Sequence, residues 1–374
     1  MPARVPHLLH IFSTFAMGGP QVRFAWLANR FGRKFRHSII ALDGNDACRG
    51  RLDGDLDLEI LPTRVSKERP LTNWIEIARQ IANVAPDQLI TYNWGAIEWA
   101  LVNRVIDHRA HIHCEDGFGP DEIDAQKWRR VFIRRLALSG RSLVVVPSRT
   151  LESIARDVWR LRPGQILYVP NGIDCTAFDQ AAPRRALPGL ERHDGLVVGT
   201  VATLRAEKNI VRLMRAFQAA RSGDARLVIA GEGPERARLE AAAAAAGLKD
   251  SVIFLGHVPN PAEVLEHFDI FALSSDTEQM PLSVLEAMAA GLPVAAVNVG
   301  DLAHMLSPEN AALLAPRGDE AGLADLLRRL LDEEPLRTRL GRSNRMNAEQ
   351  RFAESAMLAS YERIFSGAAA LNAA

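Results

Sequence analysis

The stretch that most constrains the fold of this chain is residues 269–297, in which apolar runs alternate with polar breaks. Residues 269–275 are a short apolar run of the kind that forms a buried parallel strand. Pro281 stands where a helix can begin, because the first helical residue needs no N–H donor. Gly291 ends that helix, and a second apolar run follows it. The stretch therefore predicts a strand, a loop, a helix and another strand in succession.

Two glutamates lie inside this unit, Glu278 in the predicted loop and Glu286 about one turn into the helix. A helix N-terminus that points out of the carboxyl edge of a parallel sheet favours anion binding. Carboxylates beside such a site would repel an anion, but they can accept hydrogen bonds from hydroxyl groups. An anion site flanked by carboxylates that hold hydroxyls indicates a nucleotide-sugar as the ligand.

The rest of the chain repeats this alternation in two halves. In the first half, strands are predicted at residues 7–15, 37–42, 88–92, 110–114 and 142–147. In the second half, they are predicted at residues 196–204, 225–230, 252–255, 269–275, 294–297 and 311–315. Helical patterns separate these runs, which predicts a parallel sheet covered on both faces in each half, as in Rossmann-like domains.

Residues 174–194 contain two prolines and no periodicity, and they are predicted to be a linker between the halves. We expect a first Rossmann-like domain over residues 1–180 and a second over residues 190–353, with a cleft between them. A last helical pattern covers residues 354–370. The total of 374 residues suits two domains.

Composition excludes several classes of protein. The formal net charge is zero, which argues against a dedicated nucleic-acid binder. No run approaches the roughly 18 apolar residues of a membrane span, and residues 1–15 look like a first strand, not a signal peptide. The three cysteines, Cys48, Cys114 and Cys175, predict neither a disulfide framework nor a cysteine zinc site, because they are odd in number and far apart. We expect a cytoplasmic protein.

Two basic side chains follow the first predicted strand of the second half, in the segment TLRAEKN at residues 203–209. Arg205 and Lys208 stand where the strand ends and a helix begins, and two cations with helix N–H groups suit a diphosphate. A solvated loop is the alternative. Gly231 and Gly233, in the segment GEGP, either let a ligand approach the backbone or make a tight turn.

Two segments of the first half are further candidates. Gly18 and Gly19 form the first strand-to-helix turn, which either brings backbone against a phosphate or sugar or is a turn without a ligand. His113, Glu115 and Asp116 cluster at the end of another predicted strand. They indicate a substrate-binding or general acid–base role, although a histidine at a strand end is usually structural. Their spacing is poor for a metal site.

Residues 127–141 are strongly basic and contain no acid. The cations are Lys127, Arg129, Arg130, Arg134, Arg135 and Arg141. Apolar residues alternate with them at helical spacing, which predicts either a helix on an anionic membrane surface or a core-packed helix with a basic outer face. Residues 53–57 contain Asp-x-Asp, a spacing that some metal-dependent transferases use. It has no clear strand-end setting, and we interpret it as surface.

Together these segments resemble glycosyltransferase family 4, whose members are retaining enzymes of the GT-B fold. Glu278 and Glu286 match the two glutamates that the family separates by seven residues. The segments LEAMAAGLPVAA, VPNGID, GEGP and LRAEKN match other family segments, and GGPQVRFAWLANRF resembles its N-terminal turn and helix. The resemblance covers nearly the whole chain. It implies two Rossmann-like domains facing across a deep cleft, with a C-terminal helix in residues 354–374 crossing back to the first.

The resemblance implies roles for the predicted catalytic residues His113, Glu278, Arg205 and Lys208. Lys208 and a nearby arginine would hold the diphosphate of a nucleotide-diphosphate-sugar donor, Glu286 its ribose, and Glu278 its sugar. His113 would lie near the acceptor or sugar. Further donor-site candidates are Gly18, Gly19, Thr203, Gly231, Glu232, Gly233, Leu282 and Ser283. The acceptor or membrane candidates are Glu115, Asp116, Lys127, Arg130 and Arg134.

The implied activity is metal-independent transfer of a hexosyl group to an acceptor hydroxyl, without a cofactor. The acceptor would be a glycan or a lipid-linked molecule in bacterial exopolysaccharide, lipopolysaccharide or glycolipid assembly. The protein would be cytoplasmic, with possible peripheral binding to the inner face of the cell membrane. Two alternatives stay open: a glycoside hydrolase that uses Glu278 and Glu286 as its carboxylate pair, and a nucleotide-sugar-binding protein without catalysis. A dehydrogenase is disfavoured because its glycine fingerprint is missing.

The sequence departs from the family pattern in two places. Thr203 stands two positions before Arg205, where many relatives carry arginine. Residues 279–281, Gln-Met-Pro, replace a segment that is usually rich in glycine. Since proline has no N–H, phosphate-binding amides must come from Leu282 or Ser283.

Overall fold

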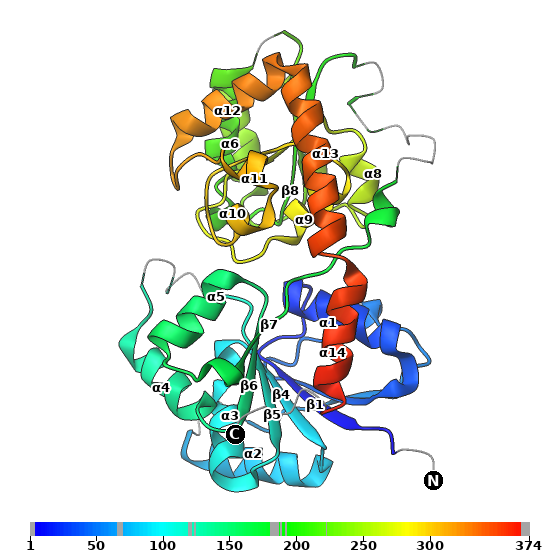
Figure 1. The fold of residues 1–374 in the computed structure, drawn as a ribbon, viewed down its shortest axis with the longest axis vertical. Coiled ribbons are helices and arrows are strands. Elements are labelled where there is room, and N and C mark those ends of the chain that lie inside the picture. The colour runs from blue at the N-terminus through cyan, green and yellow to red at the C-terminus, as the bar shows by residue number, and fades with distance from the viewer. Residues whose placement is uncertain are drawn as a thin grey trace. The chain divides into compact units, whose positions relative to one another are not determined.

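The computed structural model describes residues 4–65, 70–118, 122, 125–179, 187, 189–190, 193–221 and 223–367. The chain divides into two compact units (Figure 1). Unit 1 comprises Met1–Pro170 and Met357–Ala374, and unit 2 comprises Asn171–Ala356. The expected linker and the end of the last predicted helix lie partly outside the described residues.

Unit 1 is built on a seven-stranded sheet in the order β3-β2-β1-β4-β5-β6-β7. Its strands are β1 (His7–Phe12), β2 (Arg36–Ala41), β3 (Leu58–Leu61), β4 (Gln88–Tyr92), β5 (Ala110–Cys114), β6 (Ser142–Val146) and β7 (Ile166–Tyr168). Every neighbouring pair is parallel. A parallel sheet is covered on both faces, so its inner strands are largely apolar and buried. β1 accordingly is buried along its whole length.

Helices cover both faces of this sheet. They are α1 (Gly19–Phe31), α2 (Pro70–Val84), α3 (Ile97–Val102), α4 (Trp128–Leu138), α5 (Arg149–Ser153) and α14 (Glu354–Phe365). Two π-helical segments, Asn103–Asp107 and Ile154–Val158, extend α3 and α5. Successive side chains of a strand point to opposite faces. Leu8 of β1 therefore packs in the cluster of α1, and Leu9 packs in the cluster of α2 and α3.

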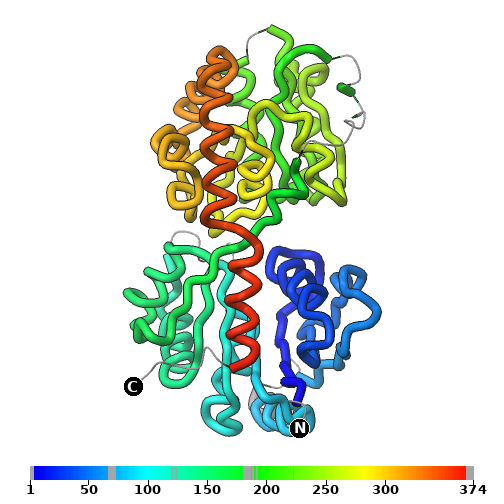
Figure 2. Tube along the Cα trace, turned by 45° about the vertical axis from the view of Figure 1, so that its right-hand side comes forward, coloured from blue at the N-terminus to red at the C-terminus, as the bar shows by residue number. Residues whose placement is uncertain are grey.

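The last helix, α14, completes the core of unit 1. Its buried apolar side chains join the cluster that contains Phe24 of α1; they are Met357, Tyr361, Ile364 and Phe365. The ring of Phe365 lies 6.0 Å from that of Phe31 and 5.7 Å from that of Phe35. Figure 2 shows α14 in red among the segments of unit 1. The C-terminal segment thus belongs to the fold of the N-terminal unit.

Unit 2 has a five-stranded parallel sheet in the order β10-β9-β8-β11-β12. The strands are β8 (Val197–Val201), β9 (Arg226–Ala230), β10 (Val252–Gly256), β11 (Ile270–Leu273) and β12 (Val294–Ala296). The helices are α6 (Ile210–Ala220), α7 (Arg236–Ala245), α8 (Ala262–Leu265), α9 (Leu282–Ala289), α10 (Leu302–Met305), α11 (Pro308–Ala311), α12 (Glu320–Asp332) and α13 (Glu334–Arg351). One continuous hydrophobic cluster holds them together.

The two parallel sheets confirm the predicted α/β fold class. Two strands, β3 and β7, were not predicted, because both are short outer strands of the sheet and neither contains a fully buried residue. The strand predicted at residues 311–315 is wrong: only Ala315 pairs, in a single bridge to Val297. Among the described residues, no helix has the length and apolar character needed to cross a bilayer.

Candidate functional site

Two loops of unit 2 meet at the carboxyl edge of its sheet, because the strands before them are neighbours. β8 pairs with β11, and the loops that follow these strands lead into α6 and α9. The Ser274 hydroxyl lies 3.0 Å from the carbonyl oxygens of both Lys208 and Asn209. The Asp276 amide donates to the Glu207 carbonyl at 2.8 Å. These contacts join the predicted cationic loop to the predicted carboxylate loop.

The closest contact between the loops is an ion pair of two predicted site residues. Lys208 Nζ lies 2.5 Å from Glu278 Oε1. The Ser275 hydroxyl donates to the same carboxylate oxygen at 2.7 Å. The two charged side chains are only 23% and 10% exposed, so solvent screens their attraction less than at an open surface. We call Lys208, Glu278 and Ser275 the lysine–glutamate cluster.

A second ion pair joins helix α6 to the carboxylate loop, and sequence reasoning missed it. Arg212 of α6 pairs with Asp276 at 2.7 Å and donates to the Ser274 carbonyl at 2.9 Å. Asn209 caps α6 by accepting from the Arg212 amide, and its own amide group lies 3.2 Å from Asp276. The signal that was available is the asparagine at a helix start, a preferred capping residue.

Helix α9 begins at Leu282, one residue after the predicted start at Pro281, which is its N-cap. The N–H groups of Leu282 and Ser283 belong to its first turn, where a helix has no internal acceptors. Glu286 lies one turn further along, and its side chain is half-buried. Burial raises the pKa of the Glu286 carboxyl to about 7, because the charged form is poorly solvated there.

The glycines of the GEGP segment have a packing role. Gly231 has a φ of +142°, and a β-carbon there would lie 1.8 Å from the Ala202 carbonyl oxygen. A β-carbon on Gly233 would lie 2.3 Å from the Leu204 carbonyl oxygen, and the Leu204 amide donates to the Glu232 carbonyl at 2.9 Å. The glycines therefore allow the backbone of this turn to pack closely against the backbone of the cationic loop.

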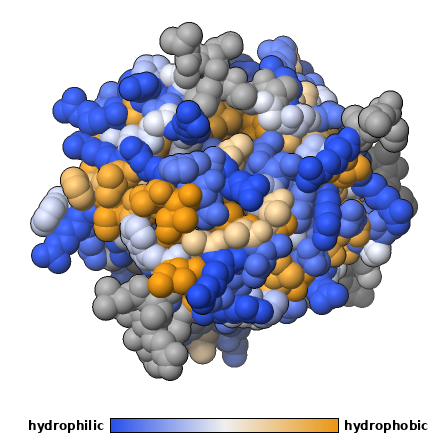
Figure 3. Space-filling view, turned by 90° about the horizontal axis from the view of Figure 1, so that it is seen from below, coloured by the Kyte–Doolittle hydropathy of each residue, from blue (hydrophilic) through white to orange (hydrophobic). Residues whose placement is uncertain are grey.

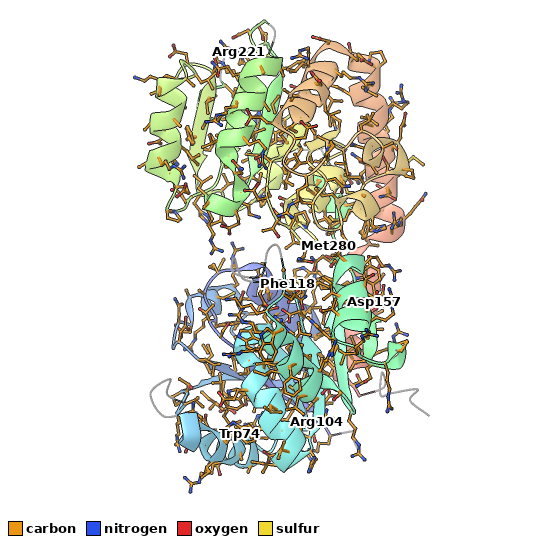
Figure 4. All side chains as sticks on the ribbon, turned by 90° about the vertical axis from the view of Figure 1, so that its left-hand side faces the viewer. Trp74, Arg104, Phe118, Asp157, Arg221 and Met280 are labelled. Atoms are coloured by element: carbon orange, nitrogen blue, oxygen red, sulfur yellow. The ribbon has the colours of Figure 1, made fainter. Side chains whose placement is uncertain are left out.

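The carboxylate loop is held by two residues that sequence reasoning did not single out. Asn171, from the VPNGID segment, donates its side-chain amide to the carbonyl of Met280 at 3.2 Å (Met280 is labelled in Figure 4). Gly300 follows β12 with a φ of +57°, and a β-carbon there would lie 2.4 Å from the Glu278 carbonyl oxygen. Only glycine permits this approach without strain.

Three other predicted donor-site residues of unit 2 are exposed. Thr203 and Arg205 lie on the cationic loop, where Arg205 precedes a short 3₁₀ turn that ends at Lys208. Glu232 is exposed and pairs with Arg236 at 2.8 Å. In unit 1, Gly19 begins α1, and among the described residues no heavy atom lies within 4 Å of a β-carbon built there. Gly18 is the N-cap of the same helix.

His113 and Glu115 form an internal cluster of unit 1 and are fully buried. His113 Nδ1 lies 2.8 Å from the Thr91 hydroxyl, and Nε2 lies 3.6 Å from a Glu115 oxygen. Arg134 Nε is 3.5 Å from that same oxygen. Asp116 is half-buried and pairs with Arg23 at 2.5 Å. In this arrangement Asp116 is partly accessible to solvent, whereas the side chains of His113 and Glu115 are not.

The basic segment forms α4, and its orientation differs from the predicted core-packed helix with a basic outer face, because Trp128 and Phe132 are exposed. Lys127 is exposed, and Arg130 is half-buried and pairs with Glu122 at 3.0 Å. Arg134, expected among the outward cations, is fully buried, and this expectation is wrong. Its charge is compensated by Glu122 at 3.2 Å, and three aromatic rings surround its guanidinium.

No group of three or more His, Cys, Asp or Glu side chains suited to a metal ion occurs in the part of the chain that the structure describes. The three cysteines are buried and free.

Comparison with known proteins identifies the family. Residues 188–346 match the family model described as glycosyl transferases group 1, and residues 18–172 match the glycosyl transferase 4-like domain. The chain therefore belongs to the group 1 glycosyl transferases, and its two Rossmann-like units form the GT-B fold.

Several relatives and solved structures resemble the chain. The 2-deoxystreptamine glucosyltransferase of Streptomyces kanamyceticus is 36% identical over 47% of this chain and 48% of its own length. The D-inositol 3-phosphate glycosyltransferase of Stackebrandtia nassauensis is 34% identical over 62% of this chain and 54% of its own length. The structure of Anabaena Alr3699/HepE in complex with UDP and glucose covers 97% of this chain and 100% of its own, with a TM-score of 0.79 and 16% identity. The chain thus spans about half the length of these two curated relatives.

Proposed function

We propose that this protein is a retaining glycosyltransferase that moves a sugar from a nucleotide-diphosphate-sugar to an acceptor hydroxyl. The observation that carries the proposal is the lysine–glutamate cluster, where one cation and one carboxylate share a partly buried position beside the start of α9. A cation beside helix N–H groups suits a diphosphate, and a carboxylate suits sugar hydroxyls. Each half of the cluster therefore matches a different part of one donor.

Donor binding would divide the cluster between these parts. The diphosphate takes Lys208 as its partner, together with Arg205 and the first N–H groups of α9. Glu278, released from the lysine, accepts hydrogen bonds from the donor sugar, and Glu286 accepts them from the ribose. The cations then face the oxygen on which negative charge develops as the diphosphate departs, where electrostatic stabilisation is most effective.

The chemical step balances without a cofactor or a redox change. The bond from the anomeric carbon to the diphosphate oxygen breaks, and the acceptor oxygen forms a new bond on the same face. The acceptor proton passes to the departing nucleoside diphosphate. We assign acceptor binding to unit 1 and expect no metal requirement, since Lys208 and Arg205 supply the positive charge.

The names of similar proteins support this assignment. HepE was solved with UDP-glucose, and WaaG, whose structure has a TM-score of 0.73 at 16% identity, is a glycosyltransferase of lipopolysaccharide biosynthesis. LpsD of Rhizobium meliloti, a lipopolysaccharide core glycosyltransferase, is 31% identical over 172 residues. We therefore propose a hexosyl donor and an acceptor that is a glycan or a lipid-linked sugar, in bacterial exopolysaccharide, lipopolysaccharide or glycolipid assembly.

A panel of UDP-, GDP- and ADP-sugars tests the proposal, with thermal shift as the binding assay and release of nucleoside diphosphate as the activity assay. The active donor should stabilise the protein by an amount that rises with the logarithm of its concentration over its dissociation constant. Lys208→Ala should lower kcat/KM by about a hundredfold or more. Lys249→Ala, an exposed lysine of the same unit, is the matched control and should stay near wild type.

Three results would contradict the proposal. Turnover of Lys208→Ala near wild type would remove the lysine from the site. Tight donor binding without transfer to any acceptor would favour a binding protein. Release of free sugar from a glycan without any nucleotide would favour a hydrolase.

A further inference from the structure

Helix α4 of unit 1 exposes large apolar side chains and buries a charged one. Trp128, Phe132 and Leu136 are 73%, 60% and 45% exposed. They stand four residues apart and so share one face of the helix. The opposite side buries Arg134 completely, together with Ala137 and Leu138. Among the described residues, Trp128 and Phe132 are the most exposed large apolar side chains.

The buried side of α4 is held by specific contacts, so the exposure of the other face is not loose packing. The Arg134 guanidinium lies 5.0 Å from the ring centroid of Trp94, 5.2 Å from that of Phe118 and 5.1 Å from that of Trp159. It also donates two hydrogen bonds to Glu122, at 3.2 and 3.3 Å. Rolling the helix to bury its apolar face would pull a charged side chain out of this cage and leave Glu122 buried without Arg134.

The surroundings of the exposed face are apolar and basic. Arg135 donates to the main-chain carbonyl of Val158, a residue that is itself exposed. At the other end, Arg104 contacts Ser139 beyond the end of α4 and precedes the exposed pair Val105 and Ile106 (Arg104 is labelled in Figure 4). Figure 3 shows that hydrophobic side chains gather in patches among hydrophilic ones on one face of the molecule.

The charge of the segment decides what can cover this face. Residues 127–141 carry six basic residues and no acidic one, in a chain whose formal net charge is zero. A second copy meeting the same face around a two-fold axis would bring like charges together. An anionic surface would be attracted, and exposed Trp, Phe and Leu beside basic residues are the composition of helices that lie in a membrane interface.

We propose that α4 docks unit 1 on an anionic lipid bilayer, with Trp128, Phe132 and Leu136 entering the interface and Lys127, Arg129 and Arg135 contacting lipid headgroups. The helix has 11 residues and is therefore about 16 Å long, so it lies along the surface without spanning it. The docking itself does not depend on the proposed transfer reaction. It deepens that proposal by favouring an acceptor that is held in a membrane.

The test uses the full chain and flotation with vesicles of phosphatidylglycerol and phosphatidylcholine, compared with vesicles of phosphatidylcholine alone. The wild-type protein should float with the anionic vesicles and be released by salt. Trp128→Ser/Phe132→Ser/Leu136→Ser should lower the affinity at least tenfold. The matched control is Ile75→Ser/Met346→Ser, which changes two exposed apolar residues elsewhere and should bind as wild type.

Arg129→Gln/Arg135→Gln tests the charge separately from the apolar face. Each basic residue near an anionic bilayer raises the affinity roughly fivefold, so this pair should lower it about 25-fold. Thermal shift with the donor nucleotide-sugar should be unchanged in every variant, which separates loss of docking from loss of the donor site. The proposal would be overturned if the wild-type protein did not float with anionic vesicles, or if the triple variant bound them as tightly as the wild type. Light scattering that shows a dimer for the wild type and a monomer for the triple variant would also overturn it.

Discussion

Lys208 and Glu278 pair with each other at the position where we propose that the donor binds. In this structure they satisfy each other at 2.5 Å, with Ser275 as a third partner. Breaking a partly buried pair by removing one member leaves the other charge poorly compensated. The proposed donor could replace both partners at once, because its diphosphate is an anion and its sugar carries hydroxyls. Under the proposed function, the pair would keep both side chains in place before the donor binds.

Glu286 gives a prediction for stability against pH. Its pKa is about 7 in the folded protein against a usual 4.5, so folding favours the neutral form. The stability that this preference contributes is fully present below about pH 4.5 and is lost as the pH rises through about 7. Glu286→Gln should therefore unfold like wild type near pH 4.5 and be more stable at pH 8, by up to about 3 kcal/mol.

Calorimetry of both proteins across this range measures the difference. Glu263→Gln, an exposed glutamate of unit 2, is the control and should show no such pH dependence. The same substitution of Glu286 should weaken donor binding if the carboxylate holds the ribose. A constant difference in stability from pH 4.5 to pH 8 would contradict the assignment of the pKa.

Gly300 gives a prediction for the position of the carboxylate loop. Gly300→Ala should destabilise the protein in two ways, through its positive φ, which costs about 1–2 kcal/mol, and through the contact with the Glu278 carbonyl. It should also weaken donor binding, since Glu278 must move. Gly318→Ala shares the positive φ, with a β-carbon in open space among the described residues, and so reports the backbone cost alone. Equal losses of stability and donor binding in the two variants, measured by calorimetry and thermal shift, would contradict the prediction.

At the scale of the element, α4 shows that a helix can be oriented by one buried charge. Removing one partner of a buried ion pair costs about 3–5 kcal/mol. We expect Arg134→Ala to lower the free energy of unfolding of unit 1 by this amount, because Glu122 loses a charged partner inside the unit. The exposed Arg129→Ala on the same helix should change it by less than about 0.5 kcal/mol.

Tryptophan fluorescence during urea denaturation measures this effect in unit 1 selectively, since all six tryptophans of the chain lie between residues 26 and 159. The double variant Arg134→Met/Glu122→Gln should recover part of the loss, because it removes the unpaired charge along with the pair. A loss for Arg134→Ala as small as that for Arg129→Ala would show that the cage does not orient the helix.

At the scale of the whole molecule, the two units differ in how much of the chain each requires. The core of unit 2 is made of residues within Asn171–Ala356, whereas that of unit 1 includes four side chains of α14. Burying four large apolar side chains contributes about 6–12 kcal/mol, which is comparable with the whole stability of a typical domain, about 5–15 kcal/mol.

We therefore expect the fragment 171–356 to fold alone and the fragment 1–170 to lack a cooperative transition. Circular dichroism measures the first, and tryptophan fluorescence in urea measures the second. Adding a peptide of residues 354–367 should restore a transition to the fragment 1–170. A fragment 1–170 as stable as unit 1 of the full chain would show that α14 is dispensable.

The sequence by itself determined the local parts of this protein. The apolar runs predicted the inner strands of both sheets, and Pro281 predicted the start of α9 to within one residue. Glu278, Glu286 and Lys208 were predicted to be site residues from their local patterns alone. These features depend on near neighbours in the chain, so periodicity and composition are enough to find them.

Only the tertiary structure decided which residues meet. Lys208 and Glu278 are 70 residues apart, and they pair because β8 and β11 are neighbours in the sheet. The orientation of α4 depends on rings from three separate segments around Arg134. Such contacts arise from packing across the chain, and local patterns do not encode it, so the outward face of Trp128, Phe132 and Leu136 could not be read from the sequence.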